Sequence, residues 1–145
     1  MSVAEKEAWT GLVSLVLLLP GRLESPLQQD ADLTLFEYLT FSHISETPGR
    51  RLRMSDLAYL ANGSLSHLSN VVKRFEQQGL GGGDPDDGGY TTAVLADTGY
   101  EMVVVTAPAH VLAVRHFGLD PLTDAEQQAL VGIAAKLRVC PVDLA

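Results

Sequence analysis

The stretch from Ser64 to Gln78 gathers side chains that are suited to chemistry with a partner. It reads SLSHLSNVVKRFEQQ, and its polar positions supply hydroxyls, an imidazole, amides and two adjacent cations. Hydroxyls and cations suit phosphate groups, whereas amides and imidazoles can hydrogen-bond to the edges of bases. These residue types predict recognition by hydrogen bonding and charge rather than the making or breaking of bonds.

An amphipathic helix must position these groups, because apolar residues recur through the stretch at the spacing i, i+3, i+4, i+7. The apolar residues are Leu68, Val71, Val72 and Phe75. Ser64 suits the N-cap of this helix and Gly79 suits its stop. One face is therefore predicted to be buried, and the polar side chains fall on the other faces.

Shorter elements lead into this helix. The stretch MSDLAYLA predicts a helix of about two turns, NGS predicts a tight turn, and RRLR before them predicts a short basic extended piece. Further upstream, Thr34 is expected to cap a helix, with Glu37 three residues later as in a capping box. The inward-facing residues of that helix are expected to be Leu35, Phe36, Leu39 and Phe41.

A β-hairpin is predicted directly after the amphipathic helix. GYTTAVL has the β-branched, alternating character of a strand and DPDDGG is turn chemistry, whereas LGGG is expected to be a poor partner strand because glycine has no side chain to pack. The segment 79–99 contains no cation. It contains four aspartates, Asp84, Asp86, Asp87 and Asp97.

Apolar helices are predicted at both ends of the chain. The first is expected from about Val3 to Leu19, where Pro20 and Gly21 interrupt it, with a short helical piece before Pro26. Its run GLVSLVLLLP is about half of the roughly 20 residues that span a bilayer, so it is not read as a transmembrane helix.

The helices near the other end are predicted from an apolar run and a capping box. After Gly99 a long apolar helix is expected, with a kink at Pro108. A last helix is expected to open with a capping box from Thr123 to Glu126. Its apolar stripe consists of Leu130, Ile133, Ala134 and Leu137.

Length and composition predict one folded domain over residues 1–145 in the cytoplasm. The chain carries 10 Lys and Arg against 18 Asp and Glu, and this net charge of −8 opposes binding to a polyanion unless the cations are gathered on one face. The single cysteine, Cys140, excludes an internal disulfide framework and is interpreted as a small apolar filler.

The order of these elements predicts the fold class. A helix, a tight turn, a longer polar-faced helix and a β-hairpin follow one another as in a winged helix-turn-helix, whose second helix enters the major groove of DNA. The fold is therefore expected to be mainly α with a small β-hairpin wing. The winged helix-turn-helix lobe is expected at 31–99, between helices from both termini.

The sequence resembles the MarR (multiple antibiotic resistance regulator) family of bacterial transcription factors over nearly its whole length. The resembling segments are LTLFEYLTFSHISETPGRRLRMSDLAYLANGSLSHLSNVVKRFEQQGL, DPDDGGYTTAVLADTG and LTDAEQQAL. Actinobacterial members look similar around PGRRLRMSDLA, while Ala96 stands where the family strand usually has Thr. The resemblance implies a homodimer formed by the helices of 1–30 and 100–145, a palindromic double-stranded DNA operator, and a repressor that a small aromatic or anionic ligand releases.

Carried over by position, the resemblance implies DNA-binding roles for six residues of the amphipathic helix: Ser64, Ser66, His67, Asn70, Lys73 and Arg74. The two serines are expected to offer hydroxyls to phosphates at the helix start, and His67 and Asn70 to reach base edges. Lys73 and Arg74 are expected to neutralise the DNA backbone. For Arg74, the alternatives are an ion pair with an aspartate of the wing and a solvated salt bridge.

The wing departs from the family pattern. Family members usually carry Arg or Lys on the first wing strand and an Arg near the turn, where this chain has glycines: Gly81, Gly82, Gly83, Gly88 and Gly89. Three interpretations stay open. The protein binds DNA chiefly through its recognition helices, or it has lost strong DNA binding and acts as a ligand-sensing dimer, or the segment has been altered from its parent sequence.

Enzymatic function is not predicted. The chain shows no nucleophile motif, phosphate loop or paired catalytic carboxylates, and neither a cofactor nor a metal is expected. Its histidines lack the i, i+4 spacing of a helical metal pair, although a metal-responsive regulator stays open: His43, His67, His110 and His116. An effector cleft is implied only by the resemblance, with five candidate residues: Trp9, Phe36, Tyr38, His43 and Phe117.

Overall fold

The computed structural model of the protein describes residues 1–138. Its α-helices are α1 (Val3–Ala31), α2 (Leu35–Ser45), α3 (Met54–Ala61), α4 (Leu65–Gln77), α5 (Asp97–Val114) and α6 (Asp124–Arg138). A 3-10 turn follows α2 (Pro48–Arg50), and a π-helical turn extends α5 (Arg115–Leu119). The strands are β1 (Arg51–Arg53), β2 (Gly81–Pro85) and β3 (Thr91–Leu95). The predicted fold class is confirmed, while Cys140 lies outside the described residues.

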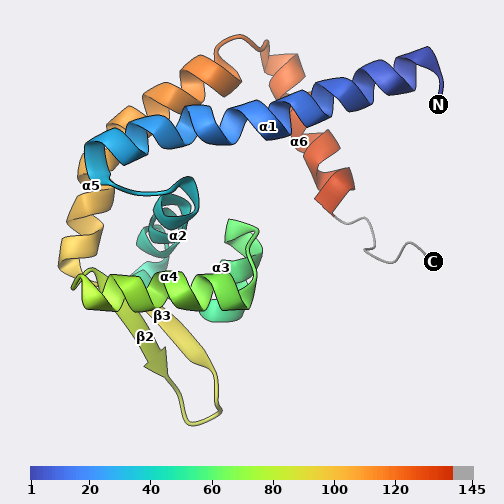
Figure 1. The fold of residues 1–145 in the computed structure, drawn as a ribbon. Helices are drawn as coiled ribbons and strands as arrows, with labels where there is room; N and C mark the ends of the chain where they lie inside the picture. Colours follow the sequence, from blue (N-terminus) through green and yellow to red (C-terminus); the bar gives the residue numbers. More distant parts are fainter. Residues whose placement is uncertain (139–145) are drawn as a thin grey trace.

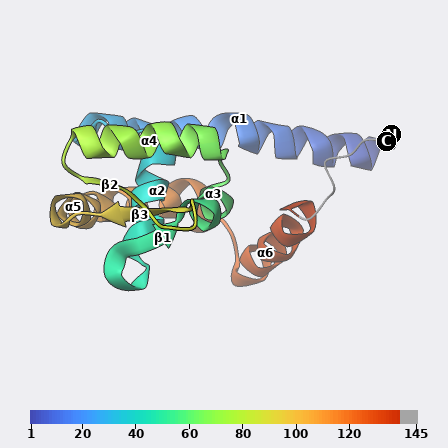
Figure 2. The same cartoon turned by 90° about the horizontal axis from the view of Figure 1, so that it is seen from below.

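The elements form two groups (Figure 1). Helices α2, α3 and α4 pack together around the base of the hairpin, whose free end projects away from them as a wing. Helices α1 and α5 lie against one another on the other side, and α1 continues well beyond the packed helices. Seen from below, α4 lies along one edge of the molecule with the sheet beside it (Figure 2).

The sheet has three antiparallel strands in the order β1-β3-β2, so the hairpin is joined by a strand from outside it. Arg51 lies opposite Val94, and Arg53 lies opposite Thr92. Asp84 of β2 pairs with Thr92 from the other side. Since directly paired residues share a face of a sheet, Arg53 and Asp84 lie on the same face. The basic extended piece predicted from RRLR is therefore the third strand of the wing.

The core of the lobe is built by the predicted apolar face of α4. Its four residues are buried, as the spacing predicted: Leu68, Val71, Val72 and Phe75. Phe75 stacks on Phe41 of α2 with the ring centroids 3.5 Å apart. Of the four residues of α2 predicted to face inward, Phe41 is fully buried, while Leu35, Phe36 and Leu39 are half-buried against the core. Tyr38, Thr40 and Ile44 are buried as well, which was not predicted.

Helix α1 is longer than predicted. It continues from Val3 to Ala31 through both Pro20 and Pro26, so the interruption expected at Pro20 is wrong. A proline in a helix removes the hydrogen bond to the carbonyl four residues earlier. For Pro20 that carbonyl belongs to Val16, whose residue is 62% exposed, so water can satisfy the freed acceptor. In contrast, α5 runs through Pro108 as expected and changes direction along its length (Figure 1).

Strand β2 is a full partner strand, although its glycines predicted a poor one. Gly81, Gly82 and Gly83 all pair with β3. The glycines let α4 approach the strand, because a Cβ atom on Gly82 would lie 2.6 Å from Cγ of Glu76. Glu76 accepts a hydrogen bond of 3.1 Å from the backbone N–H of Gly83 through Oε1. The strand is held by main-chain pairing and by this carboxylate rather than by side-chain packing.

Candidate nucleic-acid interface

An outward stripe runs along α4 opposite its buried face. A helix turns by about 100° per residue, so residues at i, i+4, i+7 and i+11 share one side. The residues of this stripe are Ser66, Asn70, Lys73 and Gln77, and all four are exposed. Three of them were predicted as site residues, whereas Gln77 was not. The stripe offers a hydroxyl, two amides and an ammonium group to a partner.

Ser64 lies at the start of the same helix and caps it as predicted. Its Oγ accepts a hydrogen bond of 3.0 Å from the backbone N–H of His67. The hydroxyl proton is free to be donated outward, because the cap uses only the acceptor capacity of Oγ. Ser64 can therefore cap the helix and contact a phosphate at the same time.

His67 and Arg74 lie on a different side of α4 from the outward stripe, facing α2. The His67 ring stacks on Phe36 with the centroids 4.2 Å apart and an angle of 13° between the rings. Arg74 donates to Glu37 through Nη2, with 2.8 Å between Nη2 and Oε1. The alternative that Arg74 pairs with a wing aspartate is wrong, because this flank of α4 faces α2 and not the hairpin.

The ion pair between Arg74 and Glu37 changes the role that the capping box predicted for Glu37 in α2. Thr34 caps the helix by accepting a hydrogen bond of 3.1 Å from the N–H of Glu37. The carboxylate of Glu37, whose side chain is only 10% exposed, binds Arg74. This pair and the His67–Phe36 stack fix the orientation of α4 against α2.

Three of the four aspartates at the wing have structural partners. Asp84 pairs with Arg51, and Asp97 binds Arg50 at 2.8 Å. Asp86 closes the turn by accepting hydrogen bonds of 2.9 Å from the N–H groups of Gly88 and Tyr90. Within residues 1–138, Asp87 has no such partner. The acidic wing is therefore largely accounted for by ion pairs and turn formation.

The cations of the wing come from β1, and sequence reasoning missed them. Arg51 and Arg53 alternate with the half-buried Leu52, so both arginines lie on the outer face of the strand. The RRLR pattern carried this signal, but nothing local shows that this strand pairs with the hairpin. Counted with Arg50, three arginines offset the four aspartates of the hairpin segment and leave a net charge of −1.

Comparison with solved structures identifies the fold and the family. A MarR family transcriptional regulator from Streptomyces coelicolor, Sco3205, solved in complex with DNA, is 34% identical, with a TM-score of 0.89 over 94% of this chain and 87% of that chain. AbsC, a MarR family transcriptional regulator from the same organism, is 33% identical, with a TM-score of 0.84 over 95% and 97% of the two chains. The chain belongs to the MarR family of transcriptional regulators.

Other comparisons add the fold alone or nothing. CouR from Rhodococcus jostii RHA1, solved with bound p-coumaroyl-CoA, is 11% identical, with a TM-score of 0.81 over 99% of both chains. No family model matches the chain, and no curated protein matches it. The neighbours in the solved structures are transcriptional regulators and not enzymes.

This MarR chain exposes apolar side chains on the helices outside the winged lobe. Exposed aliphatic residues on α1, α5 and α6 include Leu17, Val16, Val105, Leu112 and Val131. The segment Asp97–Leu119 is long and apolar enough to cross a membrane by length and composition, with 17% of its most apolar window buried inside the chain. An interface helix has the same character, because its apolar surface is covered only by a partner.

The buried Tyr38 of α2 contacts the half-buried His110 of α5 in this MarR protein. The rings of Tyr38 and His110 lie with their centroids 4.5 Å apart. Burial raises the pKa of Tyr38, with a contribution from the charge of Glu46, and burial lowers the pKa of His110. Nδ1 of His110 is buried and has no hydrogen-bond partner in the described part of the chain. Among the five aromatic and histidine residues named for an effector cleft, Tyr38 alone is fully buried, whereas Trp9 is 57% exposed.

The histidines do not meet at a metal centre in the part of the chain that the structure describes. Over residues 1–138, no group of three His, Cys, Asp or Glu side chains is placed to hold a metal ion. The His67 ring stacks on Phe36, the His110 ring lies tilted against Tyr38, and the His116 ring meets Phe117 edge to face. Each of these three rings therefore has an aromatic neighbour.

Proposed function

We propose that this MarR protein is a homodimeric repressor that binds a palindromic double-stranded DNA operator in the cytoplasm. The observation that carries the proposal is the outward stripe of α4, which presents four polar side chains beside a projecting wing. A helix of this kind fits the major groove, and its short polar side chains match the hydrogen-bonding edges of bases. The relative Sco3205, solved with DNA, supports the same role.

The proposed contacts divide the six predicted residues by their place on α4. Asn70 reads a base edge from the middle of the outward stripe, and Lys73 neutralises a phosphate. Ser64 and Ser66 donate hydroxyls to the backbone at the helix start. His67 and Arg74 do not contact DNA directly in this proposal, because both are engaged with α2. The His67 ring stacks on Phe36, and the Arg74 guanidinium pairs with Glu37. They orient the helix that makes the contacts.

The proposed dimer follows from the exposed apolar surface of the terminal helices. Val105 is 79% exposed, Leu17 74% and Val131 71%, so the isolated chain leaves large aliphatic side chains in water on three helices. A two-fold partner would cover these faces and present two copies of α4 to DNA. Two recognition helices about 34 Å apart read half-sites one turn of DNA apart, which is why a palindrome is expected.

A small ligand is proposed to release the repressor from DNA. The support is the pair of Tyr38 and His110, where an aromatic face and an unpartnered Nδ1 lie at the junction of the winged lobe with α5. An aromatic molecule with a hydrogen-bonding group could use both features. CouR, which shares the fold, was solved with p-coumaroyl-CoA, an aromatic thioester.

The test is fluorescence anisotropy with labelled duplexes from upstream of the protein's own gene and with random-sequence duplexes of the same length. Asn70→Ala is expected to reduce the discrimination between them by about 1 to 3 kcal/mol per contact. Gln29→Ala, which removes an exposed amide from α1, is the matched control. An unchanged ratio of affinities in Asn70→Ala would remove the outward stripe from sequence recognition.

A further inference from the structure

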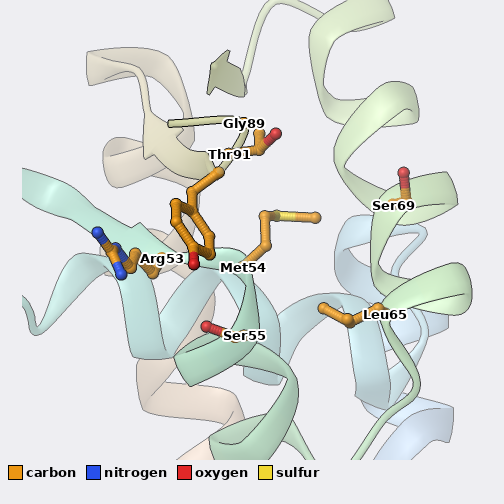
Figure 3. A pocket seen from close by; sticks show the side chains of 8 residues that line it. Arg53, Met54, Ser55, Leu65, Ser69, Gly89 and Thr91 are labelled. Atoms are coloured by element: carbon orange, nitrogen blue, oxygen red, sulfur yellow. The ribbon is translucent and has the colours of Figure 1, made fainter. Parts of the chain in front are cut away.

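A cleft of about 360 Å³ lies between the wing and the recognition helix. Figure 3 shows its lining: Arg53 from the end of β1, Met54 and Ser55 from the start of α3, Leu65 and Ser69 from α4, and Gly89 and Thr91 from the wing. The ring of Tyr90 completes one side. The cleft thus combines a guanidinium, four hydroxyls including that of Tyr90, and an aromatic face, which suits a ligand that is both anionic and partly apolar.

If the protein binds DNA as proposed, the arrangement of the two grooves indicates which part of the DNA lies in this cleft. A recognition helix in the major groove and a wing beside the adjacent minor groove lie on either side of one DNA strand, because a sugar-phosphate strand separates the two grooves. The space between α4 and the wing is therefore where that strand runs. Its phosphates are anionic and its deoxyribose rings are largely apolar, which matches the lining.

Arg53 is the cation of this region that is not already paired with a carboxylate. Arg50 binds Asp97 and Arg51 binds Asp84, whereas Arg53 has no carboxylate partner within residues 1–138. Its guanidinium lies over the Tyr90 ring, 4.7 Å from the centroid. Stacking of this kind orients a guanidinium while leaving its N–H donors free at the edges.

We propose that Arg53 binds a phosphate of the DNA strand between α4 and the wing. The glycine-rich hairpin has no cation to bind phosphate, and β1 supplies one. Tyr90 is the positioning residue that holds Arg53 at the cleft. Arg51, two residues away on the same strand, contributes little because Asp84 neutralises it. This inference rests on the proposed function, since it assumes that DNA is bound.

The experiment compares the two arginines by anisotropy on a random-sequence duplex of about 30 base pairs over about 50 to 200 mM salt. Arg53→Gln is expected to lower affinity roughly fivefold per subunit and to make the slope of log K against log salt shallower by about one unit per subunit. Arg51→Gln is the matched control and changes both quantities much less. Arg53→Lys keeps a cation and is expected to keep the slope.

Two further variants test the partners. Asp84→Asn releases Arg51 from its ion pair and is expected to steepen the slope of log K against log salt. Asp87→Asn is the control, because it removes the same charge from the hairpin without releasing an arginine. Tyr90→Ala is expected to weaken binding and Tyr90→Phe to retain it, because the ring is retained.

Three results overturn the inference. Equal effects of Arg53→Gln and Arg51→Gln would show that only net charge matters. An unchanged slope in Arg53→Gln, with its melting temperature also unchanged, would exclude a phosphate contact. If the unaltered protein binds no duplex at the lowest salt, the proposed function fails together with this inference, whereas binding that is insensitive to Arg53 overturns the inference alone.

Discussion

The contact between Arg74 and Glu37 allows a sharp test of what orients the recognition helix. Replacing Arg74 by Met keeps the aliphatic stem and removes the charge, which leaves the Glu37 carboxylate without its partner. The Glu37 side chain is only 10% exposed, while that of Arg74 is 54% exposed. The pair lies between an exposed ion pair, worth about 0 to 1 kcal/mol, and a fully buried one, whose disruption costs about 3 to 5 kcal/mol.

We therefore expect Arg74→Met to lower the free energy of unfolding by about 1 to 3 kcal/mol. Glu37→Gln removes the unpaired charge and keeps an amide oxygen where the carboxylate accepts, so it is expected to cost about 1 kcal/mol or less. In the double variant, Arg74→Met should then add little further destabilisation. The measurement is urea denaturation followed by helical circular dichroism, at one protein concentration because a dimer's stability depends on concentration.

The double-mutant cycle also separates orientation from DNA contact. If the costs of the two substitutions add to within about 0.5 kcal/mol, the two residues are not coupled and the reasoning fails. Binding is measured on the same four proteins. If Arg74→Met makes the salt slope shallower by about one unit per subunit even with Gln at position 37, Arg74 is itself a phosphate contact. An unchanged slope with reduced discrimination between sequences is the result expected of a residue that orients α4.

Three further predictions concern pH, assembly and the wing. Because burial lowers the pKa of His110 from its ordinary value of 6.5, the folded state binds this proton less readily than the unfolded state does. The contribution of neutral His110 to the free energy of unfolding should therefore be full above pH 6.5 and decrease as the pH drops below this value. In denaturation experiments, His110→Gln should remove that part of the decrease. The double variant Leu17→Glu, Val131→Glu changes side chains that are 74% and 71% exposed, so each chain should still fold. Sedimentation should then return a monomer of 15.5 kDa, and an intact dimer would contradict the proposed interface. Gly88→Arg should raise the affinity for DNA of any sequence. Gly82→Arg should instead destabilise the wing, because the new side chain displaces Glu76. Equal melting temperatures of the two variants would contradict this difference.

Local patterns predicted much of the winged lobe. The buried face of α4 and the caps at Ser64 and Thr34 follow from side-chain spacing and from hydrogen bonds between residues three apart. The continuity of α1 through Pro20 was missed, because proline propensity takes no account of where the freed carbonyl lies. In α1 that carbonyl belongs to the exposed Val16.

The composition of the candidate site depended on contacts that are distant in sequence. Arg74 and Glu37 are 37 residues apart, and Arg51 and Asp84 are 33 residues apart. Lys73 and Arg74 are adjacent in sequence but about 100° apart around the helix, and only the tertiary packing shows that Arg74 faces α2 while Lys73 faces outward. The charge of the hairpin alone likewise predicted a wing without cations, because the strand that carries them is separated from it by both helices of the helix-turn-helix.

The glycines of the wing explain why its cations lie on β1. A Cβ atom on Gly81 would meet the backbone carbonyl of Val94, and one on Gly82 would meet Glu76. Gly89 has a φ of 81°, a left-handed conformation that a side chain makes unfavourable. A basic side chain is therefore blocked by the backbone of β3 at Gly81, would have to displace the Glu76 side chain at Gly82, and would strain the turn at Gly89. β1 has no such restriction, since Arg51 and Arg53 are exposed on its outer face. Close packing of the hairpin against the recognition helix and the presence of cations at the wing are thus compatible in this protein because a third strand supplies the arginines.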